Sequence, residues 1–350
     1  MTRSKIILCR SAALIAVLSS VAPAQTLREL AQKRGVLIGT AHSGRTSDTE
    51  YLDLMGREFN QVEAENATKF GPIHPAEDSY NFAPVDTMVE YAAAHKMRVR
   101  GHVFVWHNQN PKWITDGGLS PEQLAAALQK HIATVGGRYR GKIFAWDVVN
   151  EAFLDNGSLR DTVWLNKPGI GLNGTKYMEK SFRWAREADP DAKLFYNDYS
   201  AEGVNAKSDA IYEMAKDFKK RGVPIDGIGL QAHLRLSAAG NLASIEANIK
   251  RITELGLQVH ITELDVRIPV DASGKASESD IEAQAKLYGA VASICLKYPL
   301  CTSIQTWGFT DKYSWIPRTY PGFGAALLLD RAFQPKPAYK ALLDALAATK

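Results

Sequence analysis

The chain has 350 residues, of which 45% are hydrophobic and 23% charged, and its formal net charge is +4. This composition is typical of a folded globular protein and excludes a low-complexity chain. The first 24 residues carry three positive charges and no negative ones, so their removal would leave a net charge of +1. A chain so close to neutral favours neither nucleic acid nor an anionic membrane as a partner.

The N-terminus has the pattern of a secretory signal peptide. Arg3, Lys5 and Arg10 surround the start of the apolar run SAALIAVLSSVA, and Ala22-Pro23-Ala24 supplies small residues at the cleavage position. We therefore expect a signal peptide over residues 1–24 and the mature domain over residues 25–350. The mature protein would be secreted, either extracellular or periplasmic, with no membrane attachment. The alternative, a membrane anchor, would need a longer apolar run.

The cysteines fit this interpretation. Cys9 would leave with the signal peptide, and Cys295 and Cys301 would remain as an even pair in an oxidising compartment. This favours a disulfide that closes a short loop, with two buried free thiols as the alternative. No histidine lies at ligand spacing beside them, so we expect no metal site there.

Eight short runs rich in β-branched and aromatic residues alternate with helical patterns along residues 25–350. No linker or repeat interrupts them, which predicts a single domain. Strands alternating with helices predict a parallel sheet, and eight such units predict a closed (β/α)8 TIM barrel. An open doubly wound sheet is the alternative, but no GxGxxG follows the first run. The predicted strands are 35–42, 59–66, 98–106, 143–151, 193–200, 227–233, 257–265 and 303–310.

The segment SPEQLAAALQKHIATVGG is the clearest helical pattern between these strands. Ser120 is a typical N-cap, Pro121 suits the first turn, and Gln123 completes a capping box. Apolar residues then follow at helical spacing, and Gly136 is predicted to end the helix.

Polar and aromatic side chains occur at the C-terminal ends of seven of the eight predicted strands. In a barrel these ends converge on one face, where active sites lie. A single polar strand end is usually a cap or a loop contact, but seven together indicate a functional cluster. Its members are Glu65 with Asn66, His102 with Trp106, Asn150 with Glu151, Asn197 with Asp198, Gln231 with His233, Glu263 with Asp265, and Trp307.

Two glutamates, Glu151 and Glu263, lie at this face, and glycoside hydrolysis requires such a pair of carboxyl groups. In that chemistry one carboxylic acid protonates the leaving oxygen, and the other carboxylate attacks the anomeric carbon or activates water. Trp106, Trp307 and Trp315 can stack on sugar faces, although core packing is the alternative for any one tryptophan. Hydrogen bonds to sugar hydroxyls can come from Asn150, Gln231, Lys69 and His102.

Several motifs in register resemble glycoside hydrolase family 10, the endo-β-1,4-xylanases. WDVVNE at 146–151 and ITELD at 261–265 resemble the acid/base and nucleophile signatures of that family. Further similar segments, in the same order, are WHNQNPKW (106–113), YNDY (196–199), GLQAH (229–233), WGFTDKYSW (307–315) and KPAY (336–339). The resemblance extends over residues 27–350, and the Cys295–Cys301 spacing is also similar to a disulfide of many members.

The resemblance implies a role for each matching residue. Glu151 would be the acid/base, Glu263 the nucleophile of a retaining mechanism, and Asp265 the partner of His233 beside the nucleophile. The substrate would be xylan or a xylo-oligosaccharide bound by a monomer that needs no cofactor and no metal. The implied substrate-binding residues are Glu65, Asn66, Lys69, His102, Trp106, Asn150, Gln231, His233, Trp307 and Trp315.

Two departures from the family pattern affect this cluster. Thr68 and Phe70 flank Lys69 where the family usually has methionine and tryptophan, and Val103 follows His102 where a hydroxyl residue is usual. Both affect details of sugar binding rather than the chemistry. Three rival functions stay open: hydrolysis of another β-1,4-glycan such as β-glucan, sugar binding without catalysis, and a metallohydrolase, which would need a His-x-His motif on an early strand.

Overall fold

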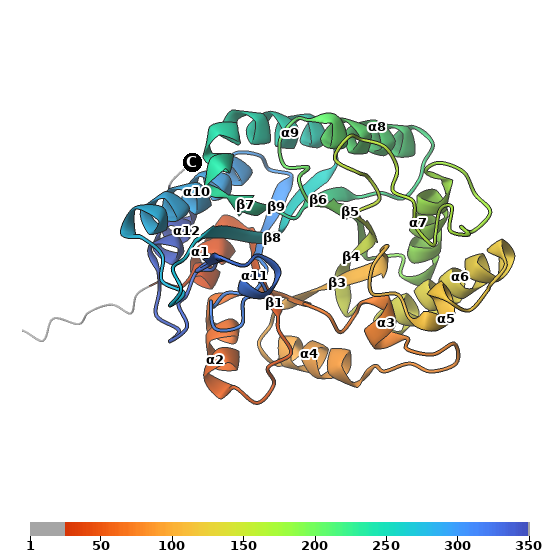
Figure 1. The fold of residues 1–350 in the computed structure, drawn as a ribbon, viewed down its shortest axis with the longest axis horizontal. Helices are drawn as coiled ribbons and strands as arrows, with labels where there is room; N and C mark the ends of the chain where they lie inside the picture. The colour runs from red at the N-terminus through yellow and green to blue at the C-terminus, as the bar shows by residue number, and fades with distance from the viewer. Residues whose placement is uncertain (1–24, 349–350) are drawn as a thin grey trace, which may run out of the picture.

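The computed structural model describes residues 25–348 as a closed barrel of parallel strands surrounded by helices (Figure 1). The predicted signal peptide, residues 1–24, lies outside the described residues. All eight predicted strands are present. They are β1 (Leu37–His42), β2 (Gln61–Ala64), β3 (Arg98–Val105), β4 (Ile143–Asn150), β5 (Lys193–Asp198), β6 (Gly227–Leu230), β8 (Gln258–Pro269) and β9 (Cys301–Thr306).

The sheet closes on itself, which confirms the predicted (β/α)8 TIM barrel and excludes the open sheet. Neighbouring strands pair in parallel from β1 to β6, β6 pairs with β8, and β9 pairs with both β8 and β1. The closing register places Leu37 opposite Ser303 and Val259 opposite Cys301. Because the eight barrel strands all point the same way, their C-terminal ends meet at one mouth.

Helices follow most strands and form the outer layer of the barrel. Among the described residues no helix is long and apolar enough to cross a membrane. The helices are α1 (Leu27–Arg34), α2 (Thr49–Glu58), α3 (Phe70–Ile73), α4 (Ala83–Ala94), α5 (Lys112–Thr115), α6 (Pro121–Arg138), α7 (Lys176–Ala188), α8 (Ala206–Lys220), α9 (Leu242–Glu254), α10 (Glu278–Leu296), α11 (Ile316–Thr319) and α12 (Pro337–Ala347), with a 3-10 helix at Leu236–Asn241.

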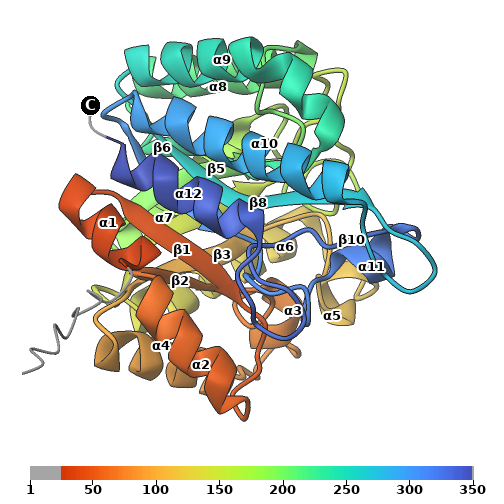
Figure 2. The ribbon, with the colours of Figure 1, turned by 90° about the vertical axis from the view of Figure 1, so that its left-hand side faces the viewer.

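The first and last helices lie side by side and complete the outer ring (Figure 2). Arg34 at the end of α1 donates from Nε to the carbonyl of Leu346 in α12 at 2.7 Å. Leu27 and Leu342, one from each helix, are fully buried in the core. The beginning and the end of the described barrel are therefore joined by apolar packing between α1 and α12 as well as by the pairing of β9 with β1.

Helix α6 begins as its sequence predicts and ends slightly later. Ser120 accepts a hydrogen bond from the backbone N–H of Gln123, and the Gln123 side chain accepts one from the backbone N–H of Ser120. The prediction that Gly136 ends the helix is wrong, because α6 continues to Arg138. Gly136 is buried in the helix, where a Cβ would approach the Cβ of Ala188 to 2.9 Å.

The sixth predicted strand is divided into two. Strand β6 ends at Leu230, and a short strand β7 (His233–Arg235) then pairs with the outer part of β8. Ala232 has a left-handed backbone conformation with φ of 60°, and its N–H donates to Glu202 Oε1 at 2.9 Å. This break turns Gln231 and His233 toward the barrel mouth.

The barrel interior below the mouth is filled by hydrogen-bonded polar side chains as well as apolar ones. Gln61 donates to Gln305 at 2.5 Å and accepts from Ser303 at 3.1 Å, and Gln305 donates to the carbonyl of Thr262 at 2.8 Å. All are buried. Such a network links β2, β8 and β9 across the interior and holds the mouth at a fixed shape.

Cys295 and Cys301 form the predicted disulfide. The bond joins the last turn of α10 to the first residue of β9, and both cysteines are buried in the hydrophobic core. It therefore constrains the loop that delivers the closing strand of the barrel.

Candidate active site

A cleft of about 500 Å³ opens at the C-terminal ends of the strands. It is lined by every residue predicted to act in catalysis or substrate binding. These are Glu65, Asn66, Lys69, His102, Trp106, Asn150, Glu151, Gln231, His233, Glu263, Trp307 and Trp315. Asp265, the predicted supporting residue, lies behind the wall in contact with His233.

Glu151 follows the last residue of β4 and has a left-handed backbone conformation, with φ of 57°. Its backbone is held from both sides: its N–H donates to the carbonyl of Asn197 at 3.0 Å, and Arg160 donates to its carbonyl at 3.0 Å. Its Oε2 accepts from the indole of Trp106 at 2.9 Å. His107 is also near this carboxyl, with Nδ1 at 3.7 Å from Oε2.

Glu263 projects from the middle of β8 into a buried position. Burial by itself would raise the pKa of Glu263, but the hydrogen bond from His233 and the charges of His102 and His233 outweigh it, so its pKa lies below the usual value. His233 Nε2 is 3.1 Å from Glu263, and Nδ1 is 2.9 Å from Asp265. The environment therefore favours the ionised form of Glu263.

A chain of side-chain amides joins the two carboxyl groups. Asn197 donates from Nδ2 to Glu263 Oε1 at 2.8 Å and to Asn150 Oδ1 at 2.9 Å. Gln231 donates to Asn150 Oδ1 at 3.1 Å and to Glu151 Oε1 at 3.0 Å. The sequence placed Asn197 in the polar cluster at the strand ends but gave it no role in catalysis or substrate binding. Its position at the end of a predicted strand was the available signal.

Residues 26–345 match the family model described as "Glycosyl hydrolase family 10".

The chain belongs to glycosyl hydrolase family 10.

Known proteins of this family are similar to the chain over most of its length. Endo-1,4-beta-xylanase B of Thermotoga neapolitana is 43% identical over 322 residues, which cover 91% of this chain and 90% of the relative. Endo-1,4-beta-xylanase 1 of Humicola insolens is 38% identical over 340 residues, covering 95% and 77%. The crystal structure of xylanase 10B from Thermotoga petrophila in complex with xylobiose has a TM-score of 0.87 and 44% identity, and covers 92% and 97%.

Membership of family 10 makes this chain a retaining glycoside hydrolase. In that reaction class a carboxylate nucleophile and a carboxylic acid lie across the scissile bond from each other. The cleft of this family 10 enzyme holds two glutamates with different surroundings. Glu263 is enclosed by a histidine and an amide, whereas Glu151 lies between indole and amide donors and the ring of His107.

Lys69 lies between the indoles of Trp106 and Trp307 at one side of the family 10 cleft. Its Nζ is 5.0 Å and 5.6 Å from the two ring centroids and donates to Asn66 Oδ1 at 3.0 Å. Burial lowers the pKa of Lys69, and the charges of Glu263, Glu65 and Glu151 oppose that shift. A partly desolvated donor between two aromatic faces is well suited to hold a sugar hydroxyl.

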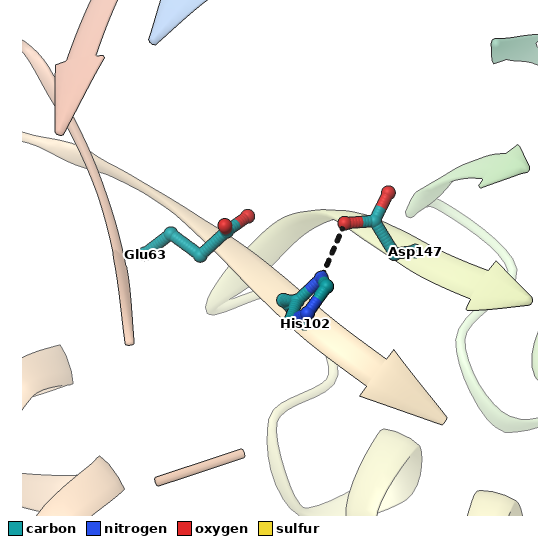
Figure 3. Close-up of side chains that lie close together, drawn as sticks. All are labelled: Glu63, His102 and Asp147. Carbon is teal, nitrogen blue, oxygen red and sulfur yellow. Dashed lines mark hydrogen bonds and ion pairs between the residues drawn. The ribbon is translucent and has the colours of Figure 1, made fainter. Parts of the chain in front are cut away.

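Figure 3 shows Glu63, His102 and Asp147 on three neighbouring strands, with His102 Nδ1 at 3.0 Å from Asp147. Each could offer one atom to a metal ion. However, Arg100 forms ion pairs with both carboxylates, at 3.1 Å to Glu63 and with a closer contact to Asp147. Because a guanidinium already contacts both acids, we interpret the cluster as a buried support that orients His102.

The two departures from the family pattern, at Thr68 with Phe70 and at Val103, lie next to each other in the structure. The hydroxyl of Thr68 donates to the backbone carbonyl of His102, immediately before the buried Val103. Phe70 stacks on the ring of His131, with centroids 3.7 Å apart. The chain therefore supports the His102 backbone with a hydroxyl from the neighbouring strand end, and Phe70 belongs to the core beneath the cleft.

Proposed function

We propose that this enzyme is an endo-1,4-β-xylanase that hydrolyses internal bonds of xylan, with Glu151 as the acid/base and Glu263 as the nucleophile. One observation above all supports the assignment of roles. Both carboxyl groups line one cleft and are linked through Asn150, Gln231 and Asn197, yet hydrogen bonding and nearby histidines favour ionisation at Glu263. The similar proteins include an endo-1,4-beta-xylanase and a xylanase in complex with xylobiose, which supports xylan as the substrate.

In the first step the Glu263 carboxylate forms a bond to the anomeric carbon while the bond from that carbon to the glycosidic oxygen breaks. Glu151 gives its proton to the departing oxygen. In the second step a water oxygen attacks the same carbon, its proton passes to Glu151, and the Glu263 carboxylate leaves. Two displacements at one carbon restore the original anomeric configuration.

Substrate binding would depend on the side chains around these two glutamates. Trp106, Trp307 and Trp315 supply flat apolar faces along the cleft, and Lys69, Asn150 and Gln231 supply hydrogen-bond donors. Glu65, Asn66, His102 and His233 complete the same wall and are proposed to bind the sugar next to the scissile bond. The active unit is proposed to be a monomer.

The proposal is tested by the release of reducing ends from soluble xylan and, in parallel, from carboxymethyl-cellulose. We expect turnover of xylan that falls below detection in Glu263→Ala. In Glu151→Ala, turnover should fall by about 10²–10⁴-fold, the usual contribution of general acid–base catalysis. A surface glutamate far from the cleft provides the matched control, so Glu254→Ala should retain full activity. Proton NMR should detect the β-anomer as the first product.

Each alternative predicts a different outcome. Turnover of the cellulose derivative alone would be consistent with the proposed mechanism but would show that xylan is not the substrate. Full activity in Glu263→Ala would overturn the nucleophile, and an α-anomer as the first product would contradict retention.

We further propose that residues 1–24 are a signal peptide and that the mature enzyme is secreted. The basic start, the apolar run and Ala22-Pro23-Ala24 support this. N-terminal sequencing of the protein recovered outside the cytoplasm should begin at Gln25. An intact Met1 on that protein would contradict the proposal.

A further inference from the structure

Two arginines face each other in register at the outer end of the cleft. Arg235 on β7 and Arg267 on β8 are direct partners in the parallel pairing of these strands, which lie side by side in Figure 1. Neighbouring strands are only about 4.8 Å apart. Like charges placed opposite each other in this way are destabilising unless an anion lies between or beside them.

Neither guanidinium has a carboxylate partner within residues 25–348, where no ion pair involves Arg235 or Arg267. Arg267 is only 7% exposed, and its buried Nε has no hydrogen-bond partner. Its Nη1 donates to the carbonyl of His233 at 3.2 Å, and its guanidinium lies 4.2 Å from the ring centroid of Tyr320. A buried cation with an unpaired donor indicates a missing acceptor.

Two carboxyl groups near this pair bond to other residues: Asp265, two positions before Arg267 on β8, and Glu202, which lines the adjoining hollow. Asp265 uses Oδ2 to accept from His233 at 2.9 Å and from the indole of Trp315 at 2.8 Å. Glu202 accepts from the backbone N–H of Ala232, and burial raises the pKa of Glu202, which favours its neutral form. Asp265 Oδ1 has no hydrogen-bond partner, and the charge of Asp265 acts to raise the pKa of Arg267. Burial and the charge of Arg235 nevertheless lower the pKa of Arg267, so the positive charge of the pair is only partly compensated.

Both arginines line the catalytic cleft and also an adjoining hollow of about 450 Å³. Along β8, Glu263, Asp265 and Arg267 occupy alternate positions and therefore project from the same face of the strand. Four residues of strand separate Glu263 from Arg267, which corresponds to about 13 Å. A group held by the arginines would thus be well away from the bond that is cleaved.

We propose that Arg235 and Arg267 form a subsite for the carboxylate of a uronic acid branch on the β-1,4-xylan chain. This rests on the proposed function, because it assumes that the main chain of the polymer occupies the cleft. The planar guanidinium group binds a carboxylate through two parallel hydrogen bonds, and the adjoining hollow offers space for a branch. The subsite would make the enzyme favour acidic xylans over neutral ones.

The first experiment measures affinity without turnover, in the Glu151→Gln background. Calorimetric titration uses a xylo-oligosaccharide carrying one glucuronic acid branch and the same compound after reduction of its carboxyl group to an alcohol. We expect the acid to bind about tenfold more tightly than the alcohol, as for a charge-assisted hydrogen bond. Salt should reduce that ratio.

Substitutions of the two arginines distinguish binding at this subsite from a general effect of the protein's positive charge on the affinity for the acid. Arg235 is exposed, so Arg235→Gln should fold normally, and it should reduce the tenfold ratio to about threefold. Adding Arg267→Gln should bring the ratio close to one, while affinity for the alcohol stays the same. Arg331→Gln removes an exposed arginine that lines a different hollow and should leave the ratio unchanged.

A second experiment compares kcat/KM for glucuronoxylan with that for the carboxyl-reduced polymer in the otherwise unmodified enzyme. Preference for the acidic polymer that Arg235→Gln diminishes would support the subsite. Equal affinity of the protein for the acid and the alcohol would overturn it, even if both polymers are hydrolysed. Failure to hydrolyse either polymer would instead overturn the proposed function, while the titration would still decide whether the arginine pair binds a carboxylate.

Discussion

Glu263 depends on neighbouring side chains for its ionised form. The carboxyl group is buried, which opposes ionisation, and the hydrogen bond from His233 is the largest single opposing influence. Burial would lower the pKa of His233 itself, but Asp265 and Glu263 together raise it well above its usual value. A protonated His233 between two carboxylates therefore keeps Glu263 ready to act as a nucleophile.

Replacing His233 with glutamine should move the acidic limb of the pH profile of kcat/KM to higher pH. The substitution removes a positive charge and changes the hydrogen bond at Glu263, so the pKa of Glu263 rises and the carboxylate is lost earlier as the pH falls. The measurement is kcat/KM on soluble xylan across the acidic range. His95→Gln, at the end of α4, is the control. An unchanged acidic limb in His233→Gln would contradict this account.

At the scale of elements, local signals determine where helices begin better than where they end. Ser120 and Gln123 are adjacent on the chain and form the capping box at the start of α6. The end of α6 depends on packing, because Gly136 faces Ala188 of α7 and the helix continues past it. The break between β6 and β7 likewise depends on Glu202, thirty positions before Ala232.

Loss of the α6 cap should reduce the stability of the barrel. In Ser120→Ala the N–H of Gln123 loses its acceptor, which typically lowers the free energy of unfolding by about 1 kcal/mol. Urea denaturation at neutral pH measures the change. Ser120→Thr keeps the hydroxyl and should restore most of the stability. Equal stability of Ser120→Ala and the unmodified enzyme would show that the cap contributes little.

At the scale of the whole molecule, the closed barrel contains charged side chains in its interior, beneath the cleft. Glu63, Arg100 and Asp147 are fully buried and come from β2, β3 and β4. Burial, followed by the charge of Asp147, raises the pKa of Glu63 well above its usual value, although Arg100 opposes the shift. The folded protein therefore binds a proton at Glu63 more readily than the unfolded chain does.

This difference makes the stability of the barrel depend on pH. The contribution of Glu63 is fully present below the carboxyl pKa of the unfolded chain, about 4.3, and is lost as pH rises through the higher folded pKa. In Glu63→Gln, which cannot ionise, stability relative to the unmodified enzyme should therefore increase from pH 4 to neutrality. Urea denaturation across that range, with Glu254→Gln as the control, measures this trend. A constant difference would contradict the raised pKa.

The sequence by itself determined the barrel, the disulfide pair and many of the residues that line the cleft. Each follows from a local pattern: strands that alternate with helices, an even pair of cysteines, and polar residues where predicted strands end. Glu151 and Glu263 were identifiable because each occupies such an end within a motif similar to family 10.

Only the tertiary structure decided which side chains contact one another across strands. The bridge through Asn197, the support of His102 by Thr68, and the register of Arg235 with Arg267 join residues from different strands or loops. Barrel closure sets these distances, and no periodicity along the chain reports them. The physical reason is that pKa shifts and hydrogen bonds depend on spatial neighbours, whereas sequence patterns report mainly local conformation and the face that is buried.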